Sequence, residues 1–183
     1  MTYRAEIPVL GFAAYSGTGK TTLLKQLLPL LHQHSIRTAV IKHAHHDFEI
    51  DHQGKDSYEL RKAGANQVLI GSKKRWALMV ENTPGHEPGL RDFIQQLDHH
   101  KLDLILVEGF KPEEIPKIEL IRTDIRAKPF YPQDKSIIAV ATDAKLEIDT
   151  GLPVLDLNDP VEIADFILSR FFRKNVTNMV SGT

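Results

Sequence analysis

The chain has 183 residues, of which 23 are basic and 24 acidic, so its formal net charge at pH 7 is −1. Charges this closely balanced give no global electrostatic reason to expect binding to DNA, RNA or a membrane surface. The absence of cysteine excludes disulfides and thiolate metal sites. The length predicts one soluble domain, residues 1–183, and no apolar run is long enough to cross a bilayer, so we expect a cytoplasmic protein.

Apolar strand-like runs alternate with helical patterns, which predicts an α/β fold with a mainly parallel sheet flanked by helices. The predicted strands cover residues 7–13, 37–42, 104–109, 117–122, 137–141 and 153–157. The predicted helices cover residues 20–33, with a bend expected at Pro29, and then 56–64, 87–99 and 160–172. Residues 67–71 and 75–81 are predicted to form an additional β-hairpin, and residues 173–183 a frayed tail.

The first strand, loop and helix have the order of a nucleoside-triphosphate phosphate loop, in the run IPVLGFAAYSGTGKTTLL. Small residues let successive N–H groups turn toward one point, and the start of the following helix adds positive potential there. Ala14 stands where the general pattern has its first glycine. The alternative is a glycine-containing turn between a buried strand and a helix. The predicted nucleotide-binding positions are Ser16, Gly17, Thr18, Gly19, Lys20, Thr21 and Thr22, with Lys20 reaching the β- and γ-phosphates and Thr21 holding Mg²⁺.

A carboxylate ends the buried run Leu104–Val107. Glu108 is therefore expected at the carboxyl edge of the sheet, where open α/β sheets bind ligands. It could support Mg²⁺ or orient a water, and the alternative is an acidic residue that merely ends a strand. Asp103 begins the same strand and lies at the wrong end for this role.

A histidine-rich stretch follows the second strand: Lys42, His43, Ala44, His45, His46 and Asp47. Imidazoles with a carboxylate suit Zn²⁺ or Ni²⁺, but the spacing matches no closed structural site. A loop that becomes ordered around nucleotide is the favoured interpretation, with Asp47 or Asp56 supporting Mg²⁺ or a water. Asp56 could instead be the N-cap of the helix that begins at Ser57.

Asp143 is the candidate for base recognition, because it follows the strand 137–141. One carboxylate can accept from both N1–H and N2–H₂ of guanine. No Asn-Lys pair precedes it, and an aspartate that stabilises a turn is the competing interpretation.

Four blocks together resemble the MobB family, molybdopterin-guanine dinucleotide biosynthesis protein B. They are SGTGKTTLL, IKHAHHDFEIDHQGKDSYELRKAGA, RWALM and LDLILVEGFKPEEIPKIEL. The resemblance spans residues 7–172, and its histidine-rich block is more discriminating than the phosphate loop. It implies a P-loop GTP-binding protein with weak GTPase activity that assists the MobA-type guanylyltransferase attaching GMP to molybdopterin. It also implies a homodimer built through extended β-structure, and it carries over Ser16 to Thr22 together with Glu108 and Gly109.

The resulting hypothesis is Mg²⁺–GTP binding in which Lys20 neutralises developing charge, Thr21 and Glu108 serve the metal, and Glu108 and Asp47 position water or the cation. Other classes stay open. These are a small-molecule kinase, a metal-delivery GTPase using His43, His45 and His46, and a nucleotide-binding adaptor without turnover.

The hairpin 67–81 and the segment 110–122 are expected to project from the nucleotide core as a β arm, whose edges a dimer would pair. The alternative is an ordinary hairpin packed on the main sheet. The turn residues Lys73, Lys74 and Arg75 could attract the phosphate of a pterin such as molybdopterin, or only keep the turn soluble.

Overall fold

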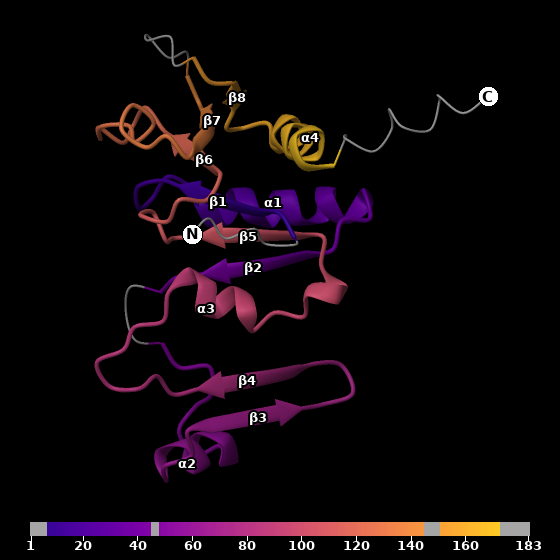
Figure 1. The fold of residues 1–183 in the computed structure, drawn as a ribbon, viewed down its shortest axis with the longest axis vertical. Coiled ribbons are helices and arrows are strands. Elements are labelled where there is room, and N and C mark those ends of the chain that lie inside the picture. Colours follow the sequence, from indigo (N-terminus) through magenta and orange to yellow (C-terminus); the bar gives the residue numbers. More distant parts are fainter. Residues whose placement is uncertain (1–6, 45–47, 145–150, 173–183) are drawn as a thin grey trace, which may run out of the picture. The chain divides into compact units, whose positions relative to one another are not determined.

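The computed structural model describes residues 7–44, 48–144 and 151–172. Contacts along the chain gather in two compact units, Met1–His43 with Gln96–Thr183, and Ala44–Gln95 (Figure 1). Each unit has its own helices and strands, and the single-domain interpretation stays a prediction. No described helix is both long and apolar enough to span a membrane.

The first unit contains a six-stranded sheet whose paired strands are all parallel. The order is β2 (Thr38–Lys42), β5 (Leu104–Glu108), β1 (Val9–Ala13), β6 (Lys117–Ile121), β7 (Ile137–Thr142) and β8 (Val154–Asp156). Residues Leu104–Val107 of β5 are buried, as expected of a strand covered on both faces. The predicted mainly parallel α/β fold is confirmed.

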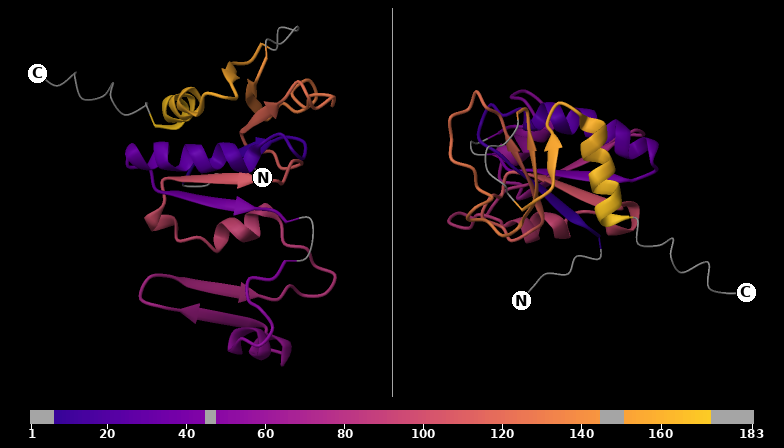
Figure 2. Two further views of the ribbon diagram at one scale, coloured as in Figure 1. Left: turned by 180° about the vertical axis from the view of Figure 1, so that it is seen from behind. Right: turned by 90° about the horizontal axis from the view of Figure 1, so that it is seen from above.

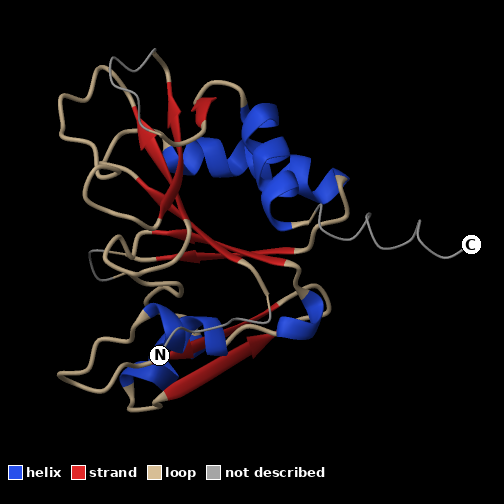
Figure 3. Cartoon of the chain, turned by 45° about the horizontal axis from the view of Figure 1, so that its top comes forward, coloured by secondary structure: helices blue, strands red, loops and turns tan. Residues whose placement is uncertain are grey.

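Two helices, α1 (Lys20–Gln33) and α4 (Pro160–Phe171), cover the same face of this sheet (Figures 2 and 3). Their buried leucines and isoleucines share one apolar core with alternate residues of the strands, among them Leu10, Leu106 and Ile118. The side-chain period of a strand is two, so these positions point to one face. The helix α1 continues through Pro29 without interruption.

The opposite face of β6 carries two buried charged residues, Lys117 and Glu119. Lys117 Nζ donates to the carbonyl oxygens of Lys111 and Glu113, each at 2.7 Å, and pairs with Asp134 at 2.8 Å. The Glu119 carboxylate accepts from the amides of Phe130 and Tyr131, both at 2.7 Å. These contacts fasten the segments before and after β6 to the sheet.

The expectation that residues 110–122 project as part of an arm is therefore wrong. Residues Lys117–Ile121 form an inner strand between β1 and β7. The alternation of Lys117 and Glu119 with Ile118 and Leu120 resembles an exposed strand in sequence. Hydrogen bonds to both side chains, with the Lys117–Asp134 ion pair, allow the strand to be buried instead.

The second unit contains α2 (Asp56–Lys62), the antiparallel hairpin β3 (Gln67–Gly71) and β4 (Trp76–Val80), and α3 (Leu90–Gln95). The predicted hairpin is confirmed as a separate two-stranded sheet. Arg61 ties its parts together, pairing with Asp51 at 2.7 Å, with Glu81 at 3.0 Å, and with Glu49. Hydrogen bonds and charge from Arg61 hold the pKa of Asp51 below its usual range despite burial.

Two predicted helices differ at their ends. The helix expected at 87–99 is limited to Leu90–Gln95. Pro88 disfavours helical geometry at Glu87, which accounts for the later start. Asp92 instead accepts from the amide of Gly89 at 2.9 Å, and a 3₁₀ turn occupies His99–Lys101. The N-cap proposed at Asp56 is wrong, since Asp56 is the first residue of α2 and Lys55 precedes it without a side-chain cap.

Candidate functional site

The loop between β1 and α1 depends on two glycines with left-handed backbone. Gly17 has φ 80° and Gly19 has φ 97°, conformations that L side chains rarely adopt. Gly19 is the residue that precedes α1, and no side chain caps this helix. Among the described residues, no backbone carbonyl accepts from the amides of Gly19, Lys20 or Thr21. Open donors and the helix dipole favour an anion at this point.

Lys20 extends its ammonium group back over the same loop. Its Nζ donates to the carbonyl oxygens of Ala14 at 3.2 Å and Tyr15 at 2.9 Å. Burial lowers its pKa from the ordinary value; Glu108 opposes this shift, while Lys111 and Lys42 add to it. Desolvated positive charge beside an open helix N-terminus suits a phosphate group.

Glu108 and Thr21 meet next to this position. The Thr21 hydroxyl donates to Glu108 Oε1 at 3.4 Å, and Lys42 Nζ lies 3.5 Å from the same oxygen. A threonine hydroxyl and a carboxylate are hard oxygen ligands, which Mg²⁺ prefers. The residues present therefore fit Mg²⁺, and the metal-binding role of Thr21 and Glu108 stays a prediction. The carboxyl ends of parallel strands share one edge, which explains why residues 87 positions apart meet.

Gly109 lets β2 and β5 approach closely just beyond Glu108. Its φ is 101°, and a Cβ built there would lie 2.7 Å from Cβ of His43. The amide of His43 donates to the carbonyl of Glu108 at 2.9 Å, and the His43 and Phe110 rings lie 4.6 Å apart. The backbone of Glu108 is thus fixed from the neighbouring strand.

Asp143 lies just after β7, as predicted, and interacts with residues that follow β6. Its carboxylate accepts from the amide of Thr123 at 3.0 Å and from Arg122 at 3.2 Å. The Thr123 amide, with help from Arg122, holds the pKa of Asp143 below its usual range although burial opposes it. This geometry matches the competing interpretation of a turn aspartate, and guanine recognition at Asp143 stays a prediction.

Arg122 was not identified from the sequence. Its Nε donates to the carbonyl of Thr18 at 3.0 Å, while another nitrogen reaches Asp143 and Asn158. One guanidinium therefore links the phosphate loop to the turn carrying the candidate base-recognition residue. The available signal was its position directly after a strand of a parallel sheet, where ligand-contacting residues gather.

The remaining predicted residues belong either to the phosphate loop itself or to the part of the chain that the structure does not describe. Asp47, His45 and His46 fall outside the described residues. Within the part of the chain that is described, no group of three or more histidine, aspartate or glutamate side chains gathers as a metal site. Ser16 and Thr22 belong to the loop and the first turn of α1, and Thr18 is buried with its hydroxyl donating to Tyr15 O at 2.8 Å.

A parallel sheet, a glycine-dependent loop before α1, and a lysine and threonine at the first helical positions define a protein of the P-loop NTPase-like class. Comparison with known protein families identifies the family within this class. Residues 9–143 match the model of MobB, "Molybdopterin guanine dinucleotide synthesis protein B", and the chain belongs to that family.

Two similar proteins carry the name molybdopterin-guanine dinucleotide biosynthesis adapter protein. The one from Escherichia coli is 50% identical over 96% of this chain and 99% of its own length. The one from Haemophilus influenzae is 49% identical over 88% of each chain. The crystal structure of Bacillus subtilis MobB, 24% identical, superposes with a TM-score of 0.70 over 90% of this chain and 98% of its own, which supports the fold.

Proposed function

We propose that this protein binds Mg²⁺–GTP and acts as an accessory protein in molybdenum cofactor biosynthesis, where GMP is joined to molybdopterin. The observation that carries the nucleotide assignment is the uncapped N-terminus of α1 with Lys20 beside it. The names of the relatives that span nearly the whole chain support the pathway. The proposed partner is a MobA-type guanylyltransferase, and the proposed place of action is the cytoplasm.

In the proposed mechanism the chain contributes position and charge rather than a covalent step. Loop amides and Lys20 bind the phosphates, and Thr21 holds the cation with Glu108 next to it. A bound Mg²⁺ would neutralise phosphate charge. Glu108, with Asp47 as a second candidate, would orient the attacking water. We propose that GTPase activity is weak in the isolated protein and that the partner supplies a further activating group.

We propose further that the protein is a homodimer formed through the β3–β4 hairpin. Residues opposite each other in an antiparallel pair share a face, so Leu69 and Leu78 lie with Trp76 and Val80. All four are exposed, Trp76 at 67% and Leu69 at 64%. An apolar sheet face of this kind favours protein–protein contact. The charge-introducing change Trp76→Glu should shift the sedimentation coefficient toward the monomer, and an unchanged coefficient in a folded variant would refute this interface.

The experiment for the nucleotide and pathway proposal measures GTP and ATP binding with and without the guanylyltransferase, followed by formation of molybdopterin-guanine dinucleotide. We expect GTP to bind more tightly than ATP, and dinucleotide formation to rise when this protein and GTP are both present. Equal binding of both nucleotides would refute the guanine preference. Dinucleotide formation that is indifferent to this protein would refute the accessory role.

A further inference from the structure

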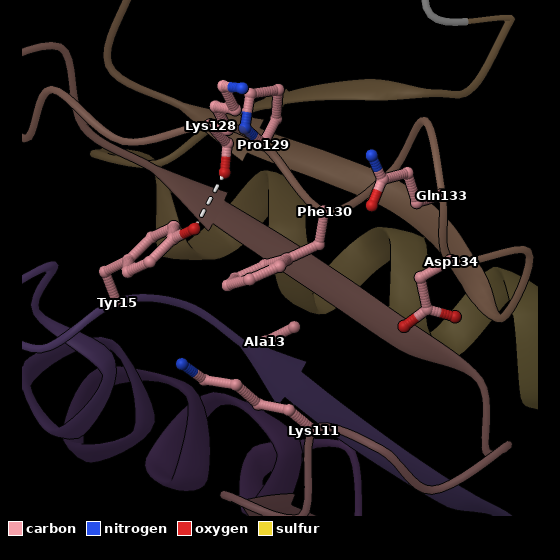
Figure 4. A pocket seen from close by; sticks show the side chains of 8 residues that line it. All are labelled: Ala13, Tyr15, Lys111, Lys128, Pro129, Phe130, Gln133 and Asp134. Atoms are coloured by element: carbon pink, nitrogen blue, oxygen red, sulfur yellow. Dashed lines mark hydrogen bonds between the residues drawn. The ribbon is translucent and has the colours of Figure 1, made fainter.

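An open cleft of about 420 Å³ lies in the first unit, beside the start of the phosphate loop. Its volume is within the ~300–1,000 Å³ typical of small-molecule sites. Its lining residues are Ala13, Tyr15, Lys111, Lys128, Pro129, Phe130, Gln133 and Asp134. Figure 4 shows the Tyr15 and Phe130 rings side by side with the Lys111 side chain extending toward them.

The aromatic and basic groups of the cleft are arranged around one another. The Tyr15 and Phe130 rings are stacked at 4.7 Å with an interplanar angle of 20°. Lys111 Nζ lies 5.1 Å from the Tyr15 ring and 5.0 Å from the Phe130 ring. The Tyr15 hydroxyl donates to the carbonyl of Lys128 at 3.0 Å, which fixes the phenol ring. Stacked rings beside the Lys111 ammonium can bind a planar ring that carries negative charge, and Lys128 lines the same cleft.

Two buried charges hold these groups in place. Glu119 fixes the backbone at Phe130, and Lys117 fixes the backbone at Lys111. Burial raises the pKa of Glu119, although the amides it accepts from oppose that shift. Gly11 leaves the space that Lys117 occupies, because a Cβ there would lie 2.8 Å from Lys117 Cγ. The buried side chains of Lys117 and Glu119 therefore fix the backbone on which Lys111 and Phe130 stand. Binding sites require side chains that are held in place in this way.

The cleft and the phosphate loop lie close enough for their charged groups to interact. The Lys111 ammonium is one of the charges that lower the pKa of Lys20. Tyr15 belongs to both places, since its carbonyl accepts from Lys20 Nζ and its ring lines the cleft. Lys111 is three residues after Glu108 in the chain. An anion in the cleft would therefore share its positive surroundings with the phosphates of a bound nucleotide.

From these observations we propose that the cleft is a second ligand site, distinct from the nucleotide site, for a planar heteroaromatic anion. The ring stacks on the Tyr15–Phe130 pair, and the anionic group pairs with Lys111 and Lys128. The ligand class is a pterin that carries an acidic group, a choice that rests on the proposed function. The stacking and charge requirements come from the cleft itself.

The experiment titrates pterin-6-carboxylate, a fluorescent planar anion, into the full chain with and without saturating GTP. We expect saturable binding in both cases, because the two ligands occupy different sites. Phe130→Leu removes the stacked ring and should weaken probe binding by about tenfold relative to the parent. Phe130→Tyr keeps an aromatic ring and should bind the probe as the parent does. Phe130→Leu should leave GTP affinity unchanged.

The charge requirement is tested by Lys128→Ala, which keeps the backbone carbonyl that accepts from Tyr15. We expect it to weaken probe binding about fivefold or more, and the exposed Lys25 on α1 supplies the control Lys25→Ala. Failure of the probe to bind a chain that binds GTP would overturn the second site but not the proposed function. Competition between GTP and the probe would also overturn the second site, because it would assign the cleft to the nucleotide base. Failure of GTP binding would instead contradict the proposed function.

Discussion

The substitution Gly109→Ala tests whether the position of Glu108 depends on the close approach of β2 and β5. In Gly109→Ala, the new Cβ would meet His43 Cβ at 2.7 Å and the His43 amide nitrogen at 3.5 Å. The His43 backbone cannot easily yield, because its amide donates to the carbonyl of Glu108. The left-handed backbone adds about 1–2 kcal/mol and the overpacking about 1–3 kcal/mol, so we expect about 2–5 kcal/mol of destabilisation.

The assay is urea denaturation, with Mg²⁺-dependent GTP binding measured on the folded variant. Two other glycines with positive φ supply controls, because a Cβ at either would meet no atom within 4 Å. Gly64 has φ +111°, close to that of Gly109, and Gly151 lies in the same compact unit as Gly109. Their alanine variants should show only the strain contribution. A Gly109→Ala protein no less stable than both controls, with unaltered Mg²⁺ dependence, would refute the steric argument.

Three further outcomes are expected. Glu108→Gln should reduce the Mg²⁺ enhancement of GTP affinity by roughly tenfold, measured by titration with and without chelator, and an unaltered enhancement would remove Glu108 from the metal site. The Arg37 hydrogen bonds lower the pKa of Asp103 from 3.8 to about 2, so this carboxylate adds stability above pH 4 that is lost as the pH falls toward 2. The difference in melting temperature between Asp103→Asn and the parent should therefore shrink between pH 6 and about pH 2.5, and a constant difference would contradict this linkage. Leu106→Ala, at a position with 0% exposure, should cost about 2–5 kcal/mol by denaturant unfolding, and a cost below about 1 kcal/mol would contradict its place in the core.

Much of the fold could be predicted because its signals are local. The apolar runs of β1 and β5, the leucine stripe of α1 and the hairpin each contain their own periodicity. That Thr21 and Glu108 would lie near each other also followed from the sequence, because both were expected at the carboxyl edge of a parallel sheet. Only the side-chain contact between them required the structure.

The remaining features depend on contacts between distant residues. Nothing near Glu119 in the sequence indicates that its carboxylate accepts from the amides of Phe130 and Tyr131, so β6 resembled part of an exposed arm. The Tyr15–Phe130 stack joins residues more than a hundred positions apart, with no local pattern to predict it. Arg122 likewise reaches Thr18 through the fold alone.

In the proposed function, the loop before α1 binds a triphosphate through its amides and Lys20. Isothermal titration of Mg²⁺–GTP into Lys20→Ala, with Lys25→Ala as the charge-matched control on the same helix, tests it most directly. We predict that Lys20→Ala stays folded and loses at least about tenfold in affinity, whereas Lys25→Ala binds as the parent does. Equal GTP affinity in all three folded proteins would contradict the claim.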